Sequence, residues 1–233
     1  MTIEIISNIA LPALQNKLLN KTAQKRVEHV FKHMEGPFAL TSSFGAQSAV
    51  CLHLLTQQFK DIPVILIDTG YLFPETYQFI DQLSERLQLN LKVYKSHLSP
   101  AWLESRYGEL WSKGLSGINK FNQIMKVNPL NNALNELGIN TWFSGIRNSQ
   151  SDTRRNKKVI EYKNQRFKIH PIIDWNDKDI FQYLKKHNLP YHPLWEKGYV
   201  SIGDTHTTQP LSANGSSQNT RFFGLKRECG IHE

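Results

Sequence analysis

The chain has 233 residues, and its 28 lysines and arginines outnumber its 20 aspartates and glutamates, which gives a formal net charge of +8. Aromatic residues make up 11% of the sequence, which argues against a disordered chain, and the length allows a substantial hydrophobic core. Two cysteines, Cys51 and Cys229, exclude a disulfide framework and cannot alone form a four-cysteine zinc or iron–sulfur site. The basic excess suggests an anionic partner.

The sequence predicts neither a membrane-spanning helix nor a signal peptide. No apolar run approaches the roughly 18 residues that a membrane helix needs. The first residues include Glu4 and no basic stretch, a pattern unlike a signal peptide. We therefore expect a soluble cytoplasmic protein with reduced cysteines and no membrane association.

Helical and strand patterns alternate along the first 145 residues. Apolar residues recur on one face from Ile9 to Met34, and Gly36-Pro37 ends the pattern, so residues 1–36 are a predicted helical lead-in. Apolar runs that end in turn residues predict strands at 38–43, 62–67, 89–94 and 141–145, with helices at about 46–59 and 74–87. Strands separated by helices favour right-handed crossovers. The predicted fold is α/β, a doubly wound and mainly parallel sheet.

The last third of the chain adds smaller elements. Residues 158–162 and 166–169 predict a hairpin, and Asp174-Trp-Asn-Asp177 is typical of a helix start. Residues 205–220 are nearly all polar, which is typical of a functional or mobile loop. We expect a single domain over residues 1–233, in which residues 204–233 form a loop and a C-terminal arm that is not ordered without ligand.

The stretch from Ser42 to Ser48 (Ser-Ser-Phe-Gly-Ala-Gln-Ser) is a candidate anion site. It joins a predicted strand to a predicted helix, where backbone N–H groups, the helix dipole and serine hydroxyls favour negative charge. It is neither a Walker A loop nor a Gly-x-Gly-x-x-Gly fingerprint, and an ordinary β–α turn is the alternative. Its place at the carboxyl edge of a strand favours ligand binding.

A second polar group, Asp68-Thr69-Gly70, follows the next predicted strand. A carboxylate there accepts hydrogen bonds from a ribose hydroxyl or an adenine amine, although Asp68 capping its own turn explains the pattern equally well. Polar groups at the carboxyl ends of two neighbouring strands together favour a nucleotide ligand.

The two cysteines lie in different surroundings. Cys51 lies among apolar residues and is expected to be a small buried hydrophobe. Cys229 lies in a polar, charged tail and is a candidate nucleophile, with an incidental surface thiol as the alternative. The charges of the tail itself do not favour a thiolate, so activation must come from elsewhere, and Lys126 and Arg221 are candidates.

Three other groups carry weaker signals. His29 and His33 have a zinc-compatible spacing but lack further ligands, so we expect no metal site. His206, after Asp204, is more typical of substrate contact or loop structure than of a catalytic triad. The basic cluster is compatible with a solvated face, phosphate binding or nucleic-acid binding, and consists of Arg147, Arg154, Arg155, Lys157 and Lys158.

From about Phe38 to Glu233 the sequence closely resembles the thioredoxin-dependent phosphoadenylyl-sulfate (PAPS) reductase family, within the adenine-nucleotide alpha-hydrolase-like superfamily. The resemblance rests on four motifs in order: Ser42-Ser-Phe-Gly-Ala-Gln-Ser48, Ile67-Asp-Thr-Gly-Tyr-Leu-Phe-Pro-Glu-Thr76, Gly203-Asp-Thr-His-Thr-Thr208 and Lys226-Arg-Glu-Cys-Gly-Ile-His232.

The resemblance implies a reaction in sulfate assimilation. The thiolate of Cys229 attacks the sulfur of PAPS, adenosine 3′,5′-bisphosphate leaves, and thioredoxin or glutaredoxin frees sulfite from the cysteine S-sulfonate. Cations at the site neutralise the charge of a thiolate that approaches a sulfonate. The resemblance further implies a homodimer that takes its reducing equivalents from thioredoxin, with no bound cofactor, no metal and no nucleic acid.

The resemblance also implies the substrate-binding residues. These are Ser42, Ser43, Phe44, Gly45, Gln47 and Ser48 around the phosphosulfate, Asp68, Thr69 and Gly70 near the adenosine, Lys126 and Arg221 at the sulfonate, Arg147 at the phosphates, and His206 and Arg227 elsewhere on the substrate. The segment that begins at Arg147 is less basic than the Arg-Arg-Glu-Gln form expected there.

One departure bears on the substrate. Related reductases that use adenylyl sulfate carry cysteine pairs that bind an iron–sulfur cluster, and here those positions are Phe121, Asn122, Asp204 and Thr207. No cluster can be assembled from these residues, which favours PAPS. The alternatives are an ATP-cleaving nucleotidyl transferase, such as a sulfate adenylyltransferase subunit, and a nucleic-acid binder. The latter has no RNA-binding motif here and ranks last.

Overall fold

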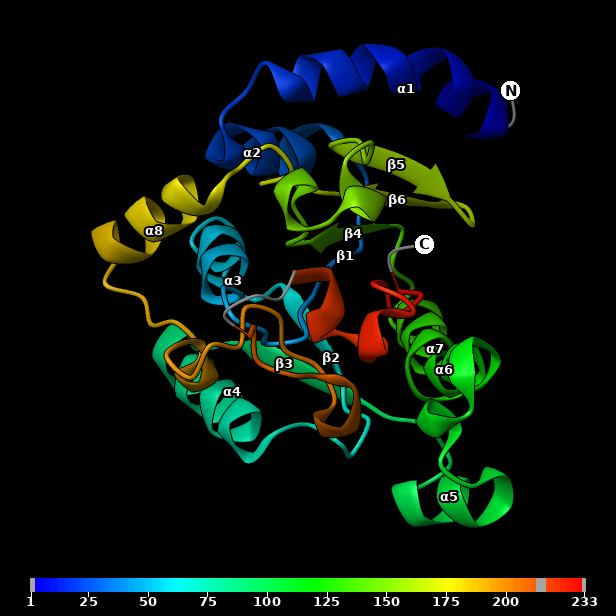
Figure 1. The fold of residues 1–233 in the computed structure, drawn as a ribbon. Helices are drawn as coiled ribbons and strands as arrows, with labels where there is room; N and C mark the ends of the chain where they lie inside the picture. The colour runs from blue at the N-terminus through cyan, green and yellow to red at the C-terminus, as the bar shows by residue number, and fades with distance from the viewer. Residues whose placement is uncertain (1–2, 213–216, 232–233) are drawn as a thin grey trace.

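The architecture is a twisted six-stranded sheet with helices on both faces (Figure 1). A computed structural model describes residues 3–212 and 217–231. The strands are β1 (Phe38–Thr41), β2 (Pro63–Ile67), β3 (Asn90–Tyr94), β4 (Thr141–Ser144), β5 (Ile160–Lys163) and β6 (Arg166–Ile169). Their order is β3-β2-β1-β4-β6-β5, and every neighbouring pair is parallel except the β5–β6 hairpin. The predicted fold class is confirmed.

Most of the helices lie in the connections between these strands, whereas the first two precede β1 and the last follows β6. They are α1 (Ile3–Leu19), α2 (Ala23–His33), α3 (Ala49–Thr56), α4 (Pro74–Leu87), α5 (Pro100–Tyr107), α6 (Gly114–Asn122), a π-helical turn (Gln123–Val127), α7 (Asn128–Glu136) and α8 (Asp177–Lys186). Short 3₁₀ turns lie at Leu110–Ser112, Asn148–Gln150, Asp152–Arg154, Pro193–Trp195, Thr205–Thr207, Ser217–Thr220 and Phe222–Gly224. None of the described helices is long and apolar enough to cross a membrane.

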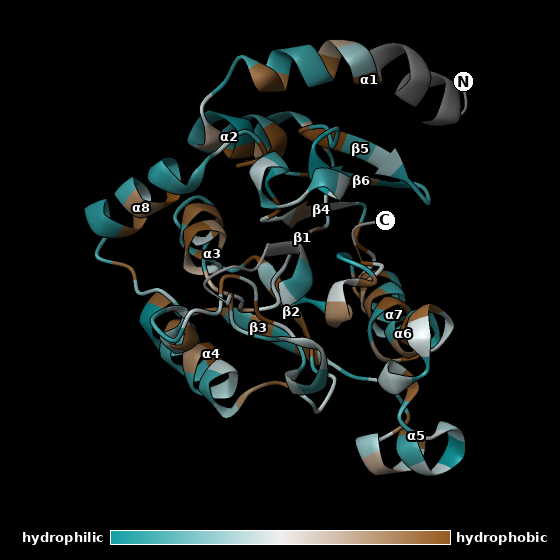
Figure 2. Cartoon of the chain, in the orientation of Figure 1, coloured by the Kyte–Doolittle hydropathy of each residue, from teal (hydrophilic) through white to brown (hydrophobic). Residues whose placement is uncertain are grey.

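Side-chain alternation along the central strands builds two hydrophobic clusters. Leu40 and Phe143 face the cluster under α2, α3, α4 and α8, whereas Ala39 and Trp142 face the cluster under α7. Strands buried on both faces read as continuous apolar runs, which is why the sequence pattern located them. Figure 2 shows apolar residues along much of α3, in line with a helix whose residues are nearly all buried.

Element boundaries differ from the predicted ones where turns intervene. The first strand ends at Thr41 and not at residue 43, because Ser42 and its successors leave the sheet to form a loop, although the Ser42 N–H still donates to the carbonyl of Ile65 at 3.0 Å. The next helix therefore begins at Ala49 rather than near residue 46. In the hairpin, Asn164 and Gln165 both take positive φ, as a tight two-residue turn requires.

The strand order reverses beside β1, and this determines where a ligand can bind. Crossovers from β1 run to β2 and β3 on one side, and the chain then returns to β4 on the other side of β1. In open α/β sheets such a switch point opens a crevice at the carboxyl ends of the strands. The C-terminal segment lines this crevice. The bridge Leu72↔Asp204 ties it to the loop after β2, and the bridge Thr208↔Arg221 joins two parts of the segment itself.

Candidate active site

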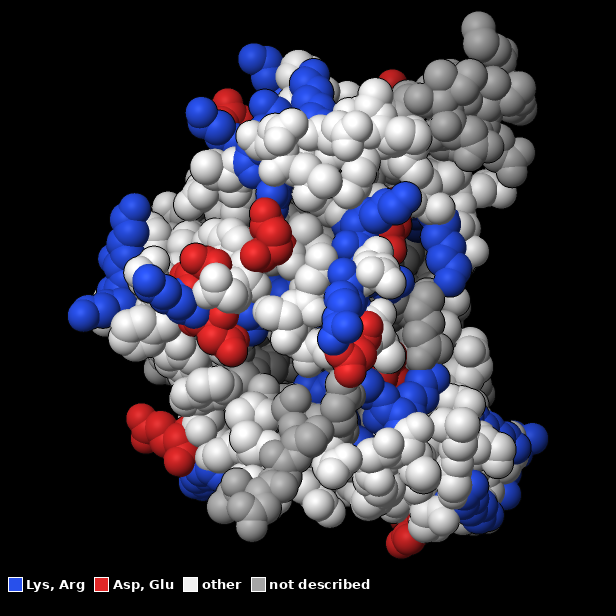
Figure 3. All heavy atoms as spheres, turned by 45° about the horizontal axis from the view of Figure 1, so that its top comes forward, with Lys and Arg blue, Asp and Glu red and all other residues white. Residues whose placement is uncertain are grey.

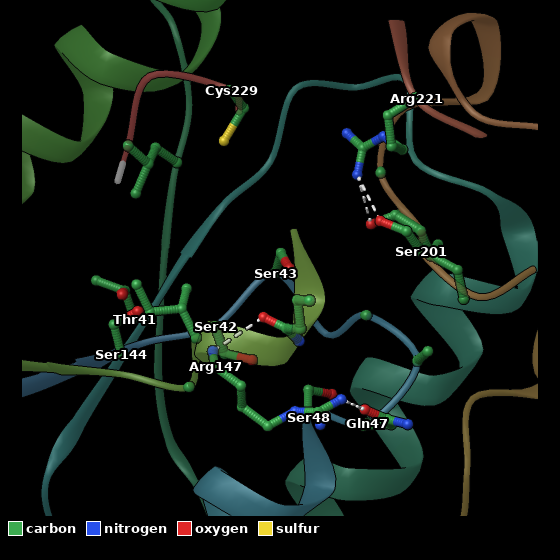
Figure 4. Close-up of a pocket in the computed structure, with 18 of the residues that line it drawn as sticks. Thr41, Ser42, Ser43, Gln47, Ser48, Ser144, Arg147, Ser201, Arg221 and Cys229 are labelled. Atoms are coloured by element: carbon green, nitrogen blue, oxygen red, sulfur yellow. Dashed lines mark hydrogen bonds between the residues drawn. The ribbon is translucent and has the colours of Figure 1, made fainter. Parts of the chain in front are cut away.

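A cavity of about 410 Å³ lies at the carboxyl edge of β1, β2 and β4 (Figure 4). The loops after β1 and β4 form one side, and residues 200–204 together with the end of the arm form the other. Eleven of the predicted site residues line it: Ser42, Ser43, Gly45, Gln47, Ser48, Thr69, Lys126, Arg147, Arg221, Arg227 and Cys229. Four do not line it: Phe44, Asp68, Gly70 and His206.

The loop Ser42–Ser48 is shaped by its own hydrogen bonds. The Ser42 hydroxyl accepts a hydrogen bond from the backbone N–H of Phe44 at 3.1 Å, and Phe44 takes a left-handed φ of 49° with its side chain fully buried. Phe44 is thus a core residue that pins the loop. The Ser48 hydroxyl is buried and has no hydrogen-bond partner among the described residues. Together with the start of α3, it offers unsatisfied donors to an anion.

Lys126 is held against the cavity by a buried carboxylate. Its Nζ lies 2.5 Å from Oδ2 of Asp204, and the Thr69 hydroxyl donates to Oδ1 of Asp204 at 2.5 Å. Burial raises the pKa of Asp204, but Lys126 and Thr69 outweigh burial and lower it, so the carboxylate is ionised. The π-helical turn that carries Lys126 adds a residue to the helix, a distortion that is frequent at functional sites.

Two arginines of the C-terminal segment add positive charge. The Arg221 guanidinium donates to the carbonyl of Ile202 at 3.3 Å, and it lies so close to Gly203 that a β-carbon there would clash with it. Its Nε is buried without a partner among the described residues. Arg227 donates to the Thr220 hydroxyl at 3.1 Å, and burial lowers its pKa to about 10.

Arg147 ties three segments together at the end of β4. Its guanidinium donates to Gln47 at 2.6 Å and to Asp177 at 2.8 Å. It also donates to the carbonyl of Trp175 at 3.2 Å and to the Ser149 hydroxyl at 3.0 Å. Arg147 is 3% exposed, and its guanidinium lines the cavity wall while it makes these four hydrogen bonds within the protein.

Asp68 and His206 have local roles in this structure. Asp68 Oδ1 accepts hydrogen bonds from the Gly70 N–H at 2.8 Å and from the Tyr77 hydroxyl at 2.7 Å, the turn-capping arrangement that competes with ribose binding. His206 stacks on Trp111 with ring centroids 3.8 Å apart, and burial lowers its pKa to about 4. A neutral His206 therefore packs beside the cavity without lining it.

The two cysteines differ as expected in burial. Cys51 is 5% exposed at the cavity floor, and burial raises the pKa of its thiol to about 12, which makes it unreactive. Cys229 is partly exposed, and in Figure 4 its sulfur points into the space between the arm and the serine loop. Burial lowers the pKa of both Arg221 and Lys168, and the charge of Cys229 opposes that shift in each, so both cations lie within electrostatic reach of the cysteine.

Three residues near Cys229 were not predicted as site residues: Arg154, Lys168 and Glu228. Arg154 carried only the signal of a basic cluster, and Lys168 read as part of a hairpin. Arg154 and Lys168 lie near Cys229 because segments 60 to 75 positions apart in the sequence pack together. A local sequence pattern could not predict this proximity.

Basic side chains gather on the face that Figure 3 shows. Figure 3 shows lysine and arginine side chains gathered around the hollowed middle of this face, with acidic side chains between them. Within the described ranges, no group of three or more histidine, cysteine, aspartate or glutamate side chains is placed to hold a metal ion. His29 and His33 lie with ring centroids 4.3 Å apart on α2, away from this cavity.

Comparison with known proteins decides the family. The model of the "Phosphoadenosine phosphosulfate reductase domain" matches residues 37–210. The chain belongs to the phosphoadenosine phosphosulfate reductase family. The family resemblance drawn from the four motifs is therefore confirmed.

Relatives match this chain over nearly its full length. It is 57% identical over 225 residues to the phosphoadenosine 5′-phosphosulfate reductase of Proteus mirabilis (strain HI4320), covering 97% of this chain and 93% of the relative. It is 56% identical to that of Serratia proteamaculans (strain 568), covering 97% and 92%. The phosphate complex of PAPS reductase from Candida auris superposes with a TM-score of 0.73 at 28% identity, covering 90% of this chain and 98% of that one. Candida glabrata FMN adenylyltransferase, at 15% identity and TM-score 0.60, covering 95% and 83%, shares the fold.

Proposed function

We propose that this protein reduces PAPS to sulfite and adenosine 3′,5′-bisphosphate through an S-sulfonate on Cys229. One observation carries the proposal: the sulfur of Cys229 faces the same cavity as the serine loop and the cations Lys126 and Arg221. Family membership and the full-length relatives support the same substrate.

The first step is a displacement at sulfur. The Cys229 thiolate supplies the electron pair of a new S–S bond to the sulfonate sulfur, and the bond from that sulfur to the bridging phosphate oxygen breaks. The leaving oxygen takes that electron pair, so the nucleotide departs as its phosphate anion. We propose that the hydroxyls and N–H groups of the serine loop bind the phosphate on which charge develops, and that Lys126 and Arg221 neutralise the sulfonate oxygens during attack. Their shared place in the lining of one cavity supports this assignment.

The second step supplies two electrons from a protein dithiol. One thiolate of reduced thioredoxin attacks Sγ of Cys229, sulfite leaves with the electron pair of the S–S bond, and a mixed disulfide remains. The second thiol of thioredoxin then displaces Cys229, which returns as a thiolate. Sulfur is reduced from the sulfate to the sulfite level, and the dithiol is oxidised to a disulfide. We propose that the dithiol protein, and no bound cofactor, provides the electrons.

The assembly and location of the enzyme are part of the same proposal. We infer a homodimer that works in the cytoplasm without nucleic acid. The basic face in Figure 3 is then a counter-charge for one small substrate that carries a phosphosulfate and a second phosphate.

Mass spectrometry of the intact protein tests the covalent step. We expect incubation with PAPS and no reductant to add one SO₃ group to Cys229, and reduced thioredoxin to remove it with stoichiometric release of sulfite. Cys51→Ala is the matched control and takes up the group normally, because the Cys51 thiol is buried. Absence of the adduct, or its retention in Cys229→Ser, contradicts the proposal. Release of pyrophosphate from ATP without thioredoxin would instead indicate a nucleotidyl transferase.

A further inference from the structure

The segment around Cys229 has no regular secondary structure, yet its position is defined by contacts on both sides of the cysteine. Among the described residues 217–231 only short 3₁₀ turns occur, and these end at Gly224. The cysteine is therefore not held by a helix or a strand. Whatever places its sulfur must act through the neighbouring residues.

The first contact precedes the cysteine. Arg154 donates from Nε to Oε1 of Glu228 at 2.7 Å and from Nη2 to Oε2 at 2.8 Å, a two-pronged ion pair. The Thr153 and Ser151 hydroxyls also donate to Oε1, at 3.0 and 3.4 Å. Glu228 is 5% exposed, so its carboxylate is satisfied within the protein and not by water. Paired, planar geometry of this kind fixes orientation as well as distance.

The second contact follows the cysteine. Lys168, buried on β6, donates from Nζ to the backbone carbonyl of Ile231 at 3.0 Å, and its ammonium lies 4.3 Å from the centre of the Trp142 ring. The Ile231 side chain packs against the apolar cluster under α7. Between the two contacts, Gly230 takes a φ of +86°, and a β-carbon there would lie 3.0 Å from Val127.

The spacing of the two contacts limits where the sulfur can go. Residues 228 and 231 are three positions apart, and an extended chain spans at most about 10 Å over three residues, so Cys229 is confined between two fixed ends. The charge of Arg154 is paired with that of Glu228, whereas Lys168 and Arg221 lie within electrostatic reach of the Cys229 thiolate.

We propose that Arg154 and Lys168 are positioning residues that seat the Cys229 nucleophile, Arg154 through Glu228 and Lys168 through the carbonyl of Ile231. The inference rests on the proposed function of Cys229. Side-chain contacts, unlike strand pairing, can open without unfolding the sheet, so the same seat can release the S-sulfonate to a dithiol protein. Seating therefore matters for attack on PAPS and not for discharge of the adduct.

A two-stage single-turnover experiment separates these steps. Each protein is mixed with excess PAPS, quenched at intervals, and the SO₃ adduct is measured; the isolated adduct is then mixed with reduced thioredoxin and sulfite is measured. We expect Arg154→Gln and Lys168→Met to slow adduct formation on the order of 10²-fold, the effect of a displaced nucleophile, while discharge stays close to wild type. Arg154→Lys, which keeps the charge but loses the two-pronged geometry, falls between.

Matched controls come from neighbouring exposed residues. Arg155→Gln and Lys158→Met change the same residue types at exposed positions outside the cavity lining and leave both stages unchanged. Unaltered adduct formation in both Arg154→Gln and Lys168→Met overturns the inference, and so does an equal slowing of formation and discharge. Failure of the proposed function looks different, because then the wild-type protein itself forms no adduct.

Alkylation provides a readout that requires no substrate. In the ligand-free protein we expect Arg154→Gln and Lys168→Met to raise the alkylation rate of Cys229 by iodoacetamide several-fold, because an unseated arm exposes the thiol. Cys51 is an internal control in the same chain: it becomes reactive only if the protein unfolds. An alkylation rate at Cys229 that equals the wild-type rate, with Cys51 protected, contradicts seating by these residues.

Discussion

The serine loop and the C-terminal arm face each other across one cavity, but they are held in different ways. The loop sits between β1, which pairs with both β2 and β4, and α3, whose side chains are almost all buried. The arm is held by the ion pair of Glu228, the hydrogen bond of Lys168 and the packing of a few apolar side chains. The half of the site that we propose for the nucleotide is therefore built into the sheet, whereas the arm brings the proposed nucleophile, Cys229, to it.

The largest expected contrast comes from two phenylalanines of equal burial. Phe143 lies on β4 and Phe222 on the arm, and both are 0% exposed. Phe143→Ala should lower the free energy of unfolding by about 4 kcal/mol, because it leaves a cavity in the central sheet. Phe222→Ala should lower it by about 1 kcal/mol or less, because the arm can open locally while the sheet stays folded. Urea denaturation measures both, and equal losses would mean that the arm is as integral as the sheet.

A smaller effect, of opposite sign, concerns the cost of burying Lys168. Burial lowers the pKa of Lys168 to about 7, against about 10.4 in an unfolded chain. Between these values the unfolded chain binds more protons, so wild-type stability rises with pH across that window. Replacing a buried charge by an apolar side chain is often stabilising, so Lys168→Met should gain about 2 kcal/mol near pH 6.

The pH dependence of that gain is the sharper test. The advantage of Lys168→Met should shrink as pH rises from about 7 toward 10, because the wild type regains the cost of its buried charge. Thermal unfolding of the two proteins across this range isolates Lys168, since their other ionisable groups are shared. A constant difference in Tm would show that the lysine is not buried as a costly cation.

The smallest change in stability is expected at Arg155, which is adjacent in sequence to Arg154, where we expect a large loss of activity. Arg155 forms an exposed pair with Asp152, with side chains 75% and 72% exposed, whereas its neighbour Arg154 binds the buried Glu228. Arg155→Gln should change the free energy of unfolding by less than about 0.5 kcal/mol and leave sulfite production intact. Denaturant unfolding and a turnover assay check this. A loss of activity comparable to that of Arg154→Gln would contradict the different roles assigned to the two arginines.

The contrast between loop and arm also explains what the sequence could predict. Periodicity located β1, β2 and β4, because buried parallel strands are short apolar runs, and the polar residues after them marked the cavity edge. It did not separate Asp68, which caps its own turn, from Thr69, which supports Asp204 at the cavity wall. Both follow the same strand, and only the path of a distant loop decides between them.

Local sequence patterns could not predict the contacts that position Cys229. Cys229 stood out because a polar tail rarely carries a cysteine without a use for it. Its neighbours in space, Arg154 and Lys168, come from a 3₁₀ turn and from β6, and nothing in either segment refers to residue 229. The expectation that the arm is unordered without ligand stays a prediction, and the seating by Arg154 and Lys168 requires the opposite. Slow alkylation of Cys229 in the ligand-free wild type, with faster alkylation in Arg154→Gln, would contradict disorder of the arm.

Steady-state sulfite production from PAPS with reduced thioredoxin tests the central claim most directly. We predict that Cys229→Ser produces no detectable sulfite, because an alcohol cannot form the S–S bond from which sulfite leaves. Cys51→Ala should turn over at close to the wild-type rate, since its thiol is buried and takes no part. Full sulfite production by Cys229→Ser would contradict the account, whatever the stability of the variant.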